Sequence, residues 1–175
     1  MRSPRSHALL VVTALATMHY CAASAPLAVG SFSELDLAVG SGLSSEITWP
    51  EILFDHQLEV RQARTALVIE STIGAILSGG YQTRLFFLQN GSKLSLRGVD
   101  LRGGVATGDC SNCSPHGGAI LMSTGSELRL LSTRMFNNRA GYGGAIYAIR
   151  STVTAIDSTM SSNSRSMRRL HRHHN

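Results

Sequence analysis

Two closely spaced cysteines are the residues of this sequence best suited to chemistry. Cys110 and Cys113 enclose two residues, and His116 follows shortly after them. Four interpretations are open, namely a disulfide that closes a surface loop, a pair of free thiols, a redox pair, or part of a zinc site. Zinc in a structural site takes four ligands, and only three candidates lie here. A thioredoxin-like pair needs a βαβ context, which the flanking sequence lacks. We therefore favour the disulfide and assign no metal and no cofactor.

The acidic residues are dispersed along the sequence. Cleavage of an acidic polysaccharide needs clustered carboxylates that hold a cation, together with a base that removes a proton. Asp55, Asp100, Asp109 and Asp157 are far apart, and no two acids share an outward column of the repeat described below. The sequence contains no G-x-S-x-G, Walker loop or H-E-x-x-H motif. We therefore name no catalytic residue and treat an enzyme as the less favoured interpretation.

Four asparagines lie in expected turns. Asn90 and Asn112 each begin an N-x-[ST] sequence, the acceptor motif for glycosylation. Glycosylation at Asn112 would compete with a disulfide at Cys113. Asn138 and Asn163 occupy equivalent places in the repeat, where their side chains are expected to bond neighbouring backbone rather than a ligand. The sequence therefore predicts glycosylation at Asn90 and Asn112 and a structural role for the other two.

The first 25 residues have the pattern of a secretory signal peptide. Arg2 and Arg5 precede an apolar run over residues 8–18, and small residues end the segment. The run is shorter than the ~20 residues of a spanning helix, and no second apolar stretch of that length follows. An uncleaved N-terminal anchor is the alternative. We expect a secreted or cell-surface protein with no transmembrane segment after the signal peptide. Cys21 would be removed together with that peptide.

The charge distribution argues against a nucleic-acid partner. The 175 residues include 16 Lys and Arg against 11 Asp and Glu, but much of the basic excess lies at the two ends. A nucleic-acid interface needs clustered cations on one face, and the interior of the chain has no such stripe. Hydrophobic residues make up 43% and charged residues 15%, which is not a disordered composition. Residues 165–175 are the exception, and we predict a disordered basic tail there.

A repeated motif indicates how the chain is organised. Gly117-Gly118-Ala119-Ile120 recurs as Gly143-Gly144-Ala145-Ile146, a period of about 26 residues that is typical of a solenoid. The alignment extends to further columns, which are Leu94 with Leu128 and Val153, Leu96 with Leu130 and Ala155, Leu101 with Met135 and Met160, and Gly104 with Asn138 and Asn163. A longer spacing before residue 117 places an insertion at residues 105–116, expected to leave the repeat as a loop.

Short β-type runs bounded by turn residues follow one another from residue 46 onward. They occupy residues 47–49, 52–54, 58–60, 66–69, 75–77 and 85–88 before the repeat begins. Residues two apart in a strand point the same way. We therefore expect inward side chains at Leu94, Leu96, Leu128, Leu130, Val153 and Ala155, and outward side chains at Ser95, Arg129 and Thr154. Paired glycines such as Gly117 and Gly118 supply the tight corners.

A short helix is expected over residues 30–42, before the first strands. Ser31 and Glu34 have the spacing of a capping box, and Gly40 lies where a helix would end. Its apolar side would contain Leu35, Leu37 and Ala38. The predicted fold is therefore all-β, a right-handed parallel β-helix of about four to five coils over residues 31–164, whose N-terminal end this helix caps.

The repeated GGAI motif, the apolar strand after it and the large apolar residue before Asn resemble the repeats of chlamydial polymorphic outer-membrane proteins. They also resemble related pectin-lyase-like β-helix proteins of algae and oomycetes. The resemblance covers roughly residues 31–164. This chain departs from the family pattern Phe-x-x-Asn, since Met135 and Met160 stand at the Phe position. Family members are usually much longer, and many carry a C-terminal barrel or anchor.

These observations predict a structural or adhesion-type β-helix protein, secreted or at the cell surface, without an evident catalytic site. Its partners would be glycans or other surface proteins. The chain would be a short or truncated member of the family. The alternatives are a polysaccharide lyase or hydrolase, since such enzymes share the β-helix, and a non-functional fragment of a longer surface protein. The last coil, residues 146–160, would present an uncapped sheet edge, which predicts self-association.

Overall fold

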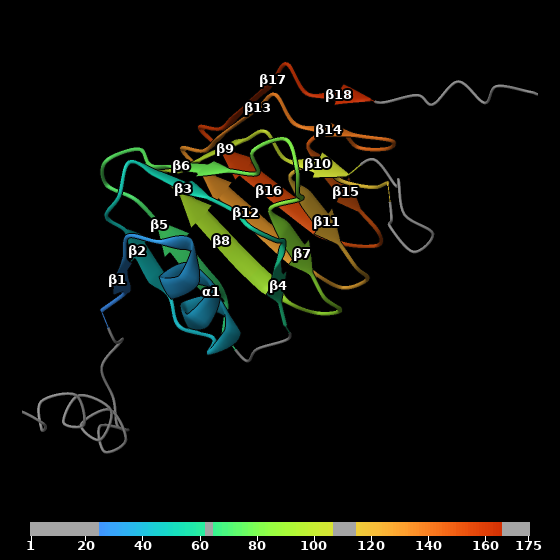
Figure 1. Cartoon of the computed structure of the whole chain (residues 1–175). Coiled ribbons are helices and arrows are strands. Elements are labelled where there is room, and N and C mark those ends of the chain that lie inside the picture. The colour runs from blue at the N-terminus through green and yellow to red at the C-terminus, as the bar shows by residue number, and fades with distance from the viewer. Residues whose placement is uncertain (1–24, 62–64, 107–114, 166–175) are drawn as a thin grey trace, which may run out of the picture.

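The computed structural model describes residues 25–61, 65–106 and 115–165. These residues form one helix and eighteen strands, and every strand pair is parallel (Figure 1). The elements are β1 Leu27–Val29, α1 Phe32–Gly40, β2 Ser45–Ile47, β3 Glu51–Leu53, β4 Leu58–Val60, β5 Leu67–Glu70, β6 Ile76–Ser78, β7 Phe86–Leu88, β8 Lys93–Arg97, β9 Asp100–Arg102, β10 Val105–Ala106, β11 Ile120–Met122, β12 Glu127–Leu131, β13 Arg134–Phe136, β14 Arg139–Ala140, β15 Ile146–Ala148, β16 Thr152–Ile156, β17 Thr159–Ser161 and β18 Ser164–Arg165.

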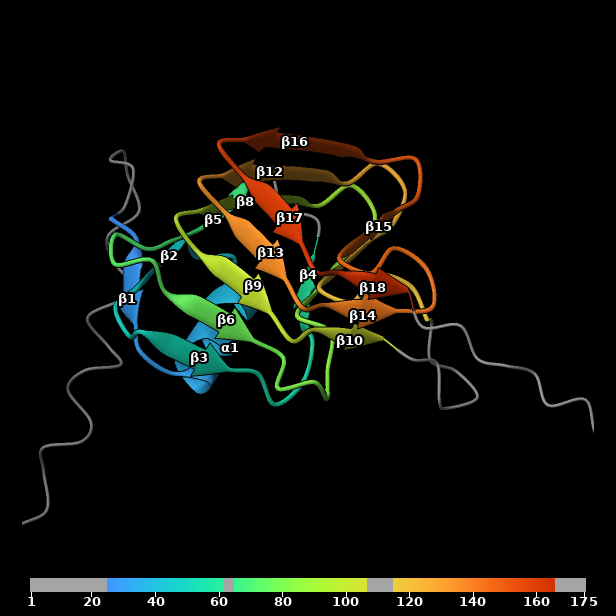
Figure 2. The same ribbon diagram turned by 90° about the horizontal axis from the view of Figure 1, so that it is seen from above.

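The strands form four parallel sheets. Sheet A has the order β1-β2-β5-β8-β12-β16, sheet B the order β3-β6-β9-β13-β17, sheet C the order β4-β7-β11-β15, and sheet D the order β10-β14-β18. From β2 onward the chain visits sheets A, B and C in turn, and sheet D joins each circuit from β10. Each return places a strand beside its predecessor in the same sheet, so the circuits stack as in a solenoid (Figures 1 and 2).

The strand register confirms the columns that the repeat predicted. Leu128 pairs with Leu94 on one side and with Val153 on the other. Met135 pairs with Leu101 and Met160 in the same way, and Ile120 pairs with Ile146. The six earlier runs correspond to β2 to β7, displaced by at most two residues. Parallel in-register pairing explains the agreement, since equivalent residues of successive circuits become direct neighbours.

The predicted facing agrees with the strand pairing, but the exposure of the side chains departs from it at two kinds of position. Leu94, Leu96, Leu128 and Leu130 are buried, and Arg129 and Thr154 are exposed. Val153 and Ala155 are exposed, because β16 is the edge strand of sheet A and no further circuit covers them. Ser95 was expected to point outward but is only 3% exposed. It pairs with Val68 and Arg129, and these longer side chains on both sides shield its short hydroxymethyl group.

The insertion predicted for residues 105–116 is shorter in the structure. Val105 and Ala106 form β10, which pairs with β14, and His116 forms an isolated bridge with Tyr142. Both ends of the predicted insertion therefore belong to the stacked circuits, since their backbone bonds to the next one. Residues 107–114, which include Cys110, Asn112 and Cys113, lie outside the described residues, as do Cys21 and residues 166–175.

The helix predicted before the first strands is confirmed as α1. The Ser31 Oγ accepts a hydrogen bond from the Glu34 N–H at 3.3 Å, and a Glu34 carboxylate oxygen accepts one from the Gly30 N–H at 2.8 Å. The bond from Gly30 is the main reason that the pKa of Glu34 lies below its ordinary value, and the bond with Ser31 adds to it. The buried side of the helix consists of Phe32, Leu35, Ala38 and Val39. Leu37 was expected on that side but is 71% exposed, because it falls outside the i, i+3 spacing of the buried residues.

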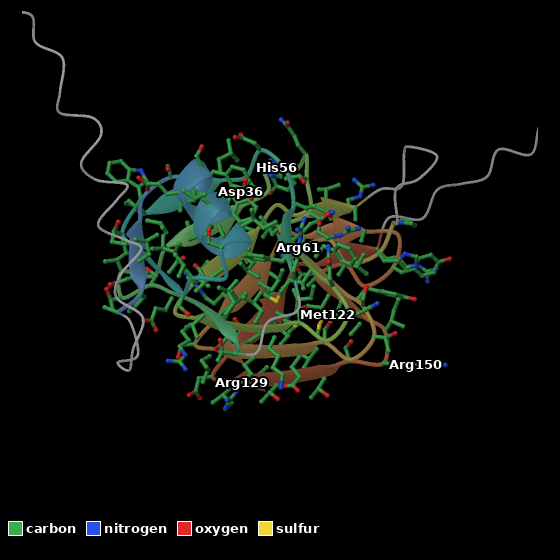
Figure 3. The ribbon with its side chains drawn as sticks, turned by 90° about the horizontal axis from the view of Figure 1, so that it is seen from below. Asp36, His56, Arg61, Met122, Arg129 and Arg150 are labelled. Atoms are coloured by element: carbon green, nitrogen blue, oxygen red, sulfur yellow. The ribbon has the colours of Figure 1, made fainter. Side chains whose placement is uncertain are left out.

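Helix α1 is attached to the core by a row of aromatic rings. The Phe32 ring centroid lies 5.0 Å from that of Phe54, which lies 5.5 Å from that of Phe86 in β7. His56 packs edge-on against Phe32 at 4.9 Å, and its Nε2 lies 3.7 Å from a carboxylate oxygen of Asp36 (Figure 3). The row extends from the helix to the second strand of sheet C, so α1 covers the N-terminal end of the stack. Strand β1, which precedes α1, pairs with β2 and adds an unpredicted edge strand to sheet A.

Replacing Phe32 by Ala should destabilise the protein by about 3–5 kcal/mol, because it empties the contact between α1 and the core. The exposed residue Leu37 on the same helix provides the control, and Leu37→Ala should change stability by no more than about 0.5 kcal/mol. Urea unfolding of both variants, followed by far-UV circular dichroism, measures the difference. Equal unfolding midpoints for the two variants would show that α1 is not held to the core by Phe32.

Candidate functional site

The outer face of sheet C carries a row of large apolar side chains. Glu59, Phe87, Leu121 and Tyr147 are direct neighbours in the register of β4, β7, β11 and β15. In the first three of these strands the residues on both sides are buried, so the central residue points outward. Neighbouring strands lie ~4.8 Å apart, so Phe87 and Tyr147 are separated by about 10 Å along the stack. Phe87, Leu121 and Tyr147, all half-buried, are called the apolar stripe below.

A cluster of aromatic and cationic side chains adjoins the Tyr147 end of the stripe. The His116 ring lies 4.2 Å from the Tyr147 ring and 5.1 Å from the Tyr142 ring, with which it is stacked at 20°. The Arg165 guanidinium lies 4.9 Å from the centre of the Tyr142 ring, at cation–π distance. Tyr142 remains 49% exposed even though its ring contacts both His116 and Arg165. The stacked rings therefore widen the apolar surface where β11 and β15 begin.

Polar groups lie beside the stripe at the opposite ends of the strands. An open hollow of about 370 Å³ is lined by Phe87, Gln89, Asn90 and Ser123. The Gln89 Nε2 donates a hydrogen bond to a carboxylate oxygen of Glu59 at 2.8 Å, which orients the amide. Hydroxyl and amide groups thus border an apolar side chain, the combination that ligand sites use to orient a bound molecule.

Arg84 joins the segments that lead into three strands of sheet C. Its Nε donates to the Gly117 carbonyl at 2.9 Å, and its Nη1 donates to the Gln57 side-chain oxygen at 2.8 Å. Burial lowers the pKa of the Arg84 guanidinium from its ordinary value. Gln57, Arg84 and Gly117 precede β4, β7 and β11 respectively, so this side chain joins three neighbouring strands of sheet C, two of which carry residues of the apolar stripe.

The repeated GGAI motif positions the aromatic cluster. Gly117 and Gly143 have φ values of +64° and +60°, in the left-handed region that favours glycine. A Cβ at Gly118 would overlap the backbone of Gly144 and Arg139, which belong to the next circuit. The following residues Ala119, Ile120, Ala145 and Ile146 lead into or begin β11 and β15. The motif has a structural role, because these glycines turn the chain so that His116 lies against Tyr142 and Tyr147.

Asn138 and Asn163 form a ladder inside the stack. The Asn138 Oδ1 accepts a hydrogen bond from the Gly104 N–H at 2.8 Å, and its Nδ2 donates to the Leu101 carbonyl at 3.1 Å. The same Nδ2 donates to the Asn163 Oδ1 at 3.0 Å, and Asn163 in turn donates to the Met135 carbonyl at 2.9 Å. The side-chain polar atoms of both asparagines are therefore hydrogen-bonded to backbone groups or to each other. The sequon residue Asn90, by contrast, is exposed and lines the hollow beside Phe87.

The described carboxylates do not gather into a centre. Asp100 is buried, and its Oδ1 accepts a hydrogen bond from the Arg134 Nε at 2.9 Å. This hydrogen bond and the charge of Asp100 raise the pKa of Arg134. Asp55 and Asp157 are exposed, and Asp109 lies outside the described residues. Over residues 25–61, 65–106 and 115–165, no three His, Cys, Asp or Glu side chains approach one another closely enough to hold a metal ion.

The sequence analysis did not predict the apolar stripe. Its only signal is that Phe86–Leu88, Ile120–Met122 and Ile146–Ala148 are apolar throughout, and such a run does not show which side faces solvent. In a sheet with one solvated face the outward position of such a run is normally polar. An apolar residue at that position in three aligned strands marks either a second buried face or a contact surface.

The fold and this face define the class of protein. It is an all-β protein of stacked parallel sheets, with a half-buried apolar stripe on sheet C. None of its described residues form a helix long and apolar enough to cross a membrane. No family model, no curated protein and no solved structure matches the chain.

Proposed function

We propose that this chain is an adhesion-type protein, secreted or displayed at the cell surface, which binds an extended glycan along the apolar stripe. The observation that carries the proposal is the outward row of Phe87, Leu121 and Tyr147 on a rigid sheet. The C–H faces of sugar rings pack against aromatic rings, while sugar hydroxyls need hydrogen-bonding groups beside them. A row that continues across three strands suits a chain of sugars better than a single small molecule.

The polar groups favour a glycan over a protein partner. Gln89, Asn90 and Ser123 offer amide and hydroxyl groups in an open hollow next to Phe87. The aromatic anchors of a protein interface lie in well-packed pockets that exclude water, whereas the hollow beside Phe87 is open. The ion pair between Asp100 and Arg134 gives the lyase alternative no uncommitted carboxylate at that position.

The fold proposed for this function is a right-handed parallel β-helix of the pectin-lyase-like kind. The stacked parallel register supports it, and connections between parallel strands of one sheet are right-handed in nearly all proteins. The resemblance to chlamydial polymorphic outer-membrane protein repeats rests on the GGAI motifs at Gly117 and Gly143 and on the Asn138–Asn163 column. The proposed signal peptide over residues 1–25 is the basis for the extracellular location.

Two measurements test the proposal. The purified protein is first tested for binding to a panel of immobilised glycans. Titration calorimetry then measures its affinity for a soluble oligosaccharide of the type that bound. Tyr147→Ala and Phe87→Ala should each weaken binding about tenfold, because each removes one stacking surface. Trp49→Ala is the matched control, since Trp49 is an aromatic residue, 61% exposed, that belongs to the turn between sheets A and B. It should leave the affinity unchanged.

Two results would overturn the proposal. One is a folded protein that binds no glycan of the panel. The other is a glycan whose binding survives Tyr147→Ala and Phe87→Ala but fails with Trp49→Ala, which would place the contact elsewhere. Circular dichroism of each variant ensures that a loss of binding is not a loss of fold.

A further inference from the structure

Among the described residues, one whole end of the stack consists of strand edges without a further partner strand. Strands β15, β16, β17 and β18 are the terminal strands of sheets C, A, B and D. Figure 2 shows β16 and β17 at the side of the stack opposite β1 and β3. Val153 and Met160 are 38% and 49% exposed, whereas Leu128 and Met135 one circuit earlier are 1% and 0% exposed. The core is therefore open at this end, while α1 covers the other.

Strand β16 lacks the features that keep an edge strand from pairing. Its five residues, Thr152–Ile156, include no charge and no proline, and all of them except Ala155 are β-branched. The preceding strands of sheet A carry ion pairs on their outer face, such as Lys93 with Glu127 at 2.9 Å. An uncharged five-residue edge over an open core is suited to accept another strand.

The backbone of β16 presents two residues to a new partner. The Thr152 N–H donates to the Ser126 carbonyl, and the Ile156 carbonyl accepts from the Ser132 N–H, both at 3.0 Å. In a parallel ladder alternate residues turn both backbone groups to the same neighbour. Val153 and Ala155 therefore turn their N–H and C=O groups to the open edge. These are also the residues whose side chains face the core.

We propose that a second copy of this chain covers this end, with the two β16 strands paired antiparallel about a two-fold axis at Thr154. Val153 of one copy then lies opposite Ala155 of the other, and each pair exchanges both backbone hydrogen bonds. Residues opposite one another share a face, so both apolar ends meet and form one continuous core. The interface is isologous and closes as a dimer.

Charge complementarity selects this antiparallel arrangement. Arg150 and Asp157 flank β16 at its two ends, both are exposed, and neither has an ion-pair partner among the described residues. A two-fold axis at Thr154 brings Arg150 of each copy beside Asp157 of the other, which makes the same opposite-charge contact twice. Figure 3 shows Arg150 projecting from the surface. Parallel addition of a second chain would not bring these two charges together.

The residues that follow β18 are a less suitable cover. Residues 166–175 contain Met167 and Leu170 as their only large apolar side chains, among several Arg and His. Two such side chains cannot replace the stacked apolar layer that a second copy supplies. The proposal commits to the second copy, and the tail becomes one outcome of the test.

Sedimentation equilibrium of the full chain over a range of protein concentration tests the proposal, and we expect a dimer. Arg150→Glu or Asp157→Arg alone should weaken the dimer about tenfold, because each attraction becomes a repulsion at two places. The double variant carrying both changes should restore it. Val153→Lys should give a monomer, because it places a charge on the inward face of the edge.

Three outcomes would overturn the proposal. The first is a monomer at every concentration. The second is a double charge variant that associates no better than the single variants, which would exclude the antiparallel register. The third is a monomer that dimerises only when residues 166–175 are removed, which would make the tail the cover. Circular dichroism of all variants separates loss of association from loss of fold.

Discussion

Replacing Gly118 by Ala is expected to lower the free energy of unfolding by more than about 3 kcal/mol. A Cβ on Gly118 would lie 2.7 Å from the Arg139 amide nitrogen and 2.8 Å from its carbonyl oxygen, and closer still to the Gly144 carbonyl. All three atoms are backbone, so none can rotate away as a side chain would. Relief requires two stacked circuits to separate, which strains the parallel ladder on both sides of the corner.

Two other glycines provide graded controls for this substitution. At Gly144 the added Cβ would meet the Ser164 backbone, at 2.7 Å from its oxygen, but that segment is exposed at the end of the stack and can shift. Gly144→Ala should therefore cost less than Gly118→Ala. At Gly40, the last residue of α1, nothing lies within 4 Å of an added Cβ, so Ala should be neutral or stabilising by up to about 1 kcal/mol.

The measurement is the urea midpoint and slope for the three variants and the unchanged protein. Equal losses for Gly118→Ala and Gly40→Ala would mean that the effect comes from glycine's backbone freedom and not from the close approach of two circuits. A Gly118→Ala protein as stable as the unchanged one would contradict the stacking distance at this corner.

Replacing Asn138 by Ala is the second change with a large expected effect, a loss of about 3–5 kcal/mol. Asn138 is fully buried, and the substitution leaves the Gly104 N–H without its side-chain partner and removes the amide's bonds to the Leu101 carbonyl and to Asn163. An orphaned buried group costs about 1–3 kcal/mol, and the other lost bonds and the vacated volume add to this. The ladder is thus a source of stability rather than a binding site.

Asn163→Ala is the matched control for the ladder. Asn163 makes the same kind of bond one circuit later, to the Met135 carbonyl, but it is only half-buried. Water can replace its amide there, so we expect a loss of about 1 kcal/mol. Thermal unfolding of both variants checks the ratio. A larger loss at Asn163 than at Asn138 would show that burial does not set the strength of the ladder.

Much of the core could be predicted from the sequence because the fold is repetitive. When circuits stack in parallel register, equivalent residues become neighbours, so an alignment of the chain with itself is also a list of contacts. That is why the columns of Leu94, Leu101 and Ile120 agree with the strand pairs. The cap at Ser31 was equally local, since it depends on one hydroxyl and the N–H three residues later.

The candidate site could not be predicted in the same way. The apolar stripe depends on which side of sheet C faces solvent, and an all-apolar run such as Phe86–Leu88 does not reveal that. The contact of His116 with Tyr142 and Tyr147 joins residues on either side of a turn and in successive circuits. The low exposure of Ser95 could not be predicted for a related reason, because it depends on the length of the side chains at Val68 and Arg129.

The amino-acid sequence alone carries the repeat, its glycine corners, its apolar columns and its cap, because each of these depends on residue type and spacing along the chain. Tertiary structure was needed to show the stripe on sheet C, the pairing of β1 with β2 and the open end at β16. These features depend on which residues of other strands lie next to a given residue, and on whether a further strand covers it. Neither kind of spatial relation produces a periodic signal in a linear sequence.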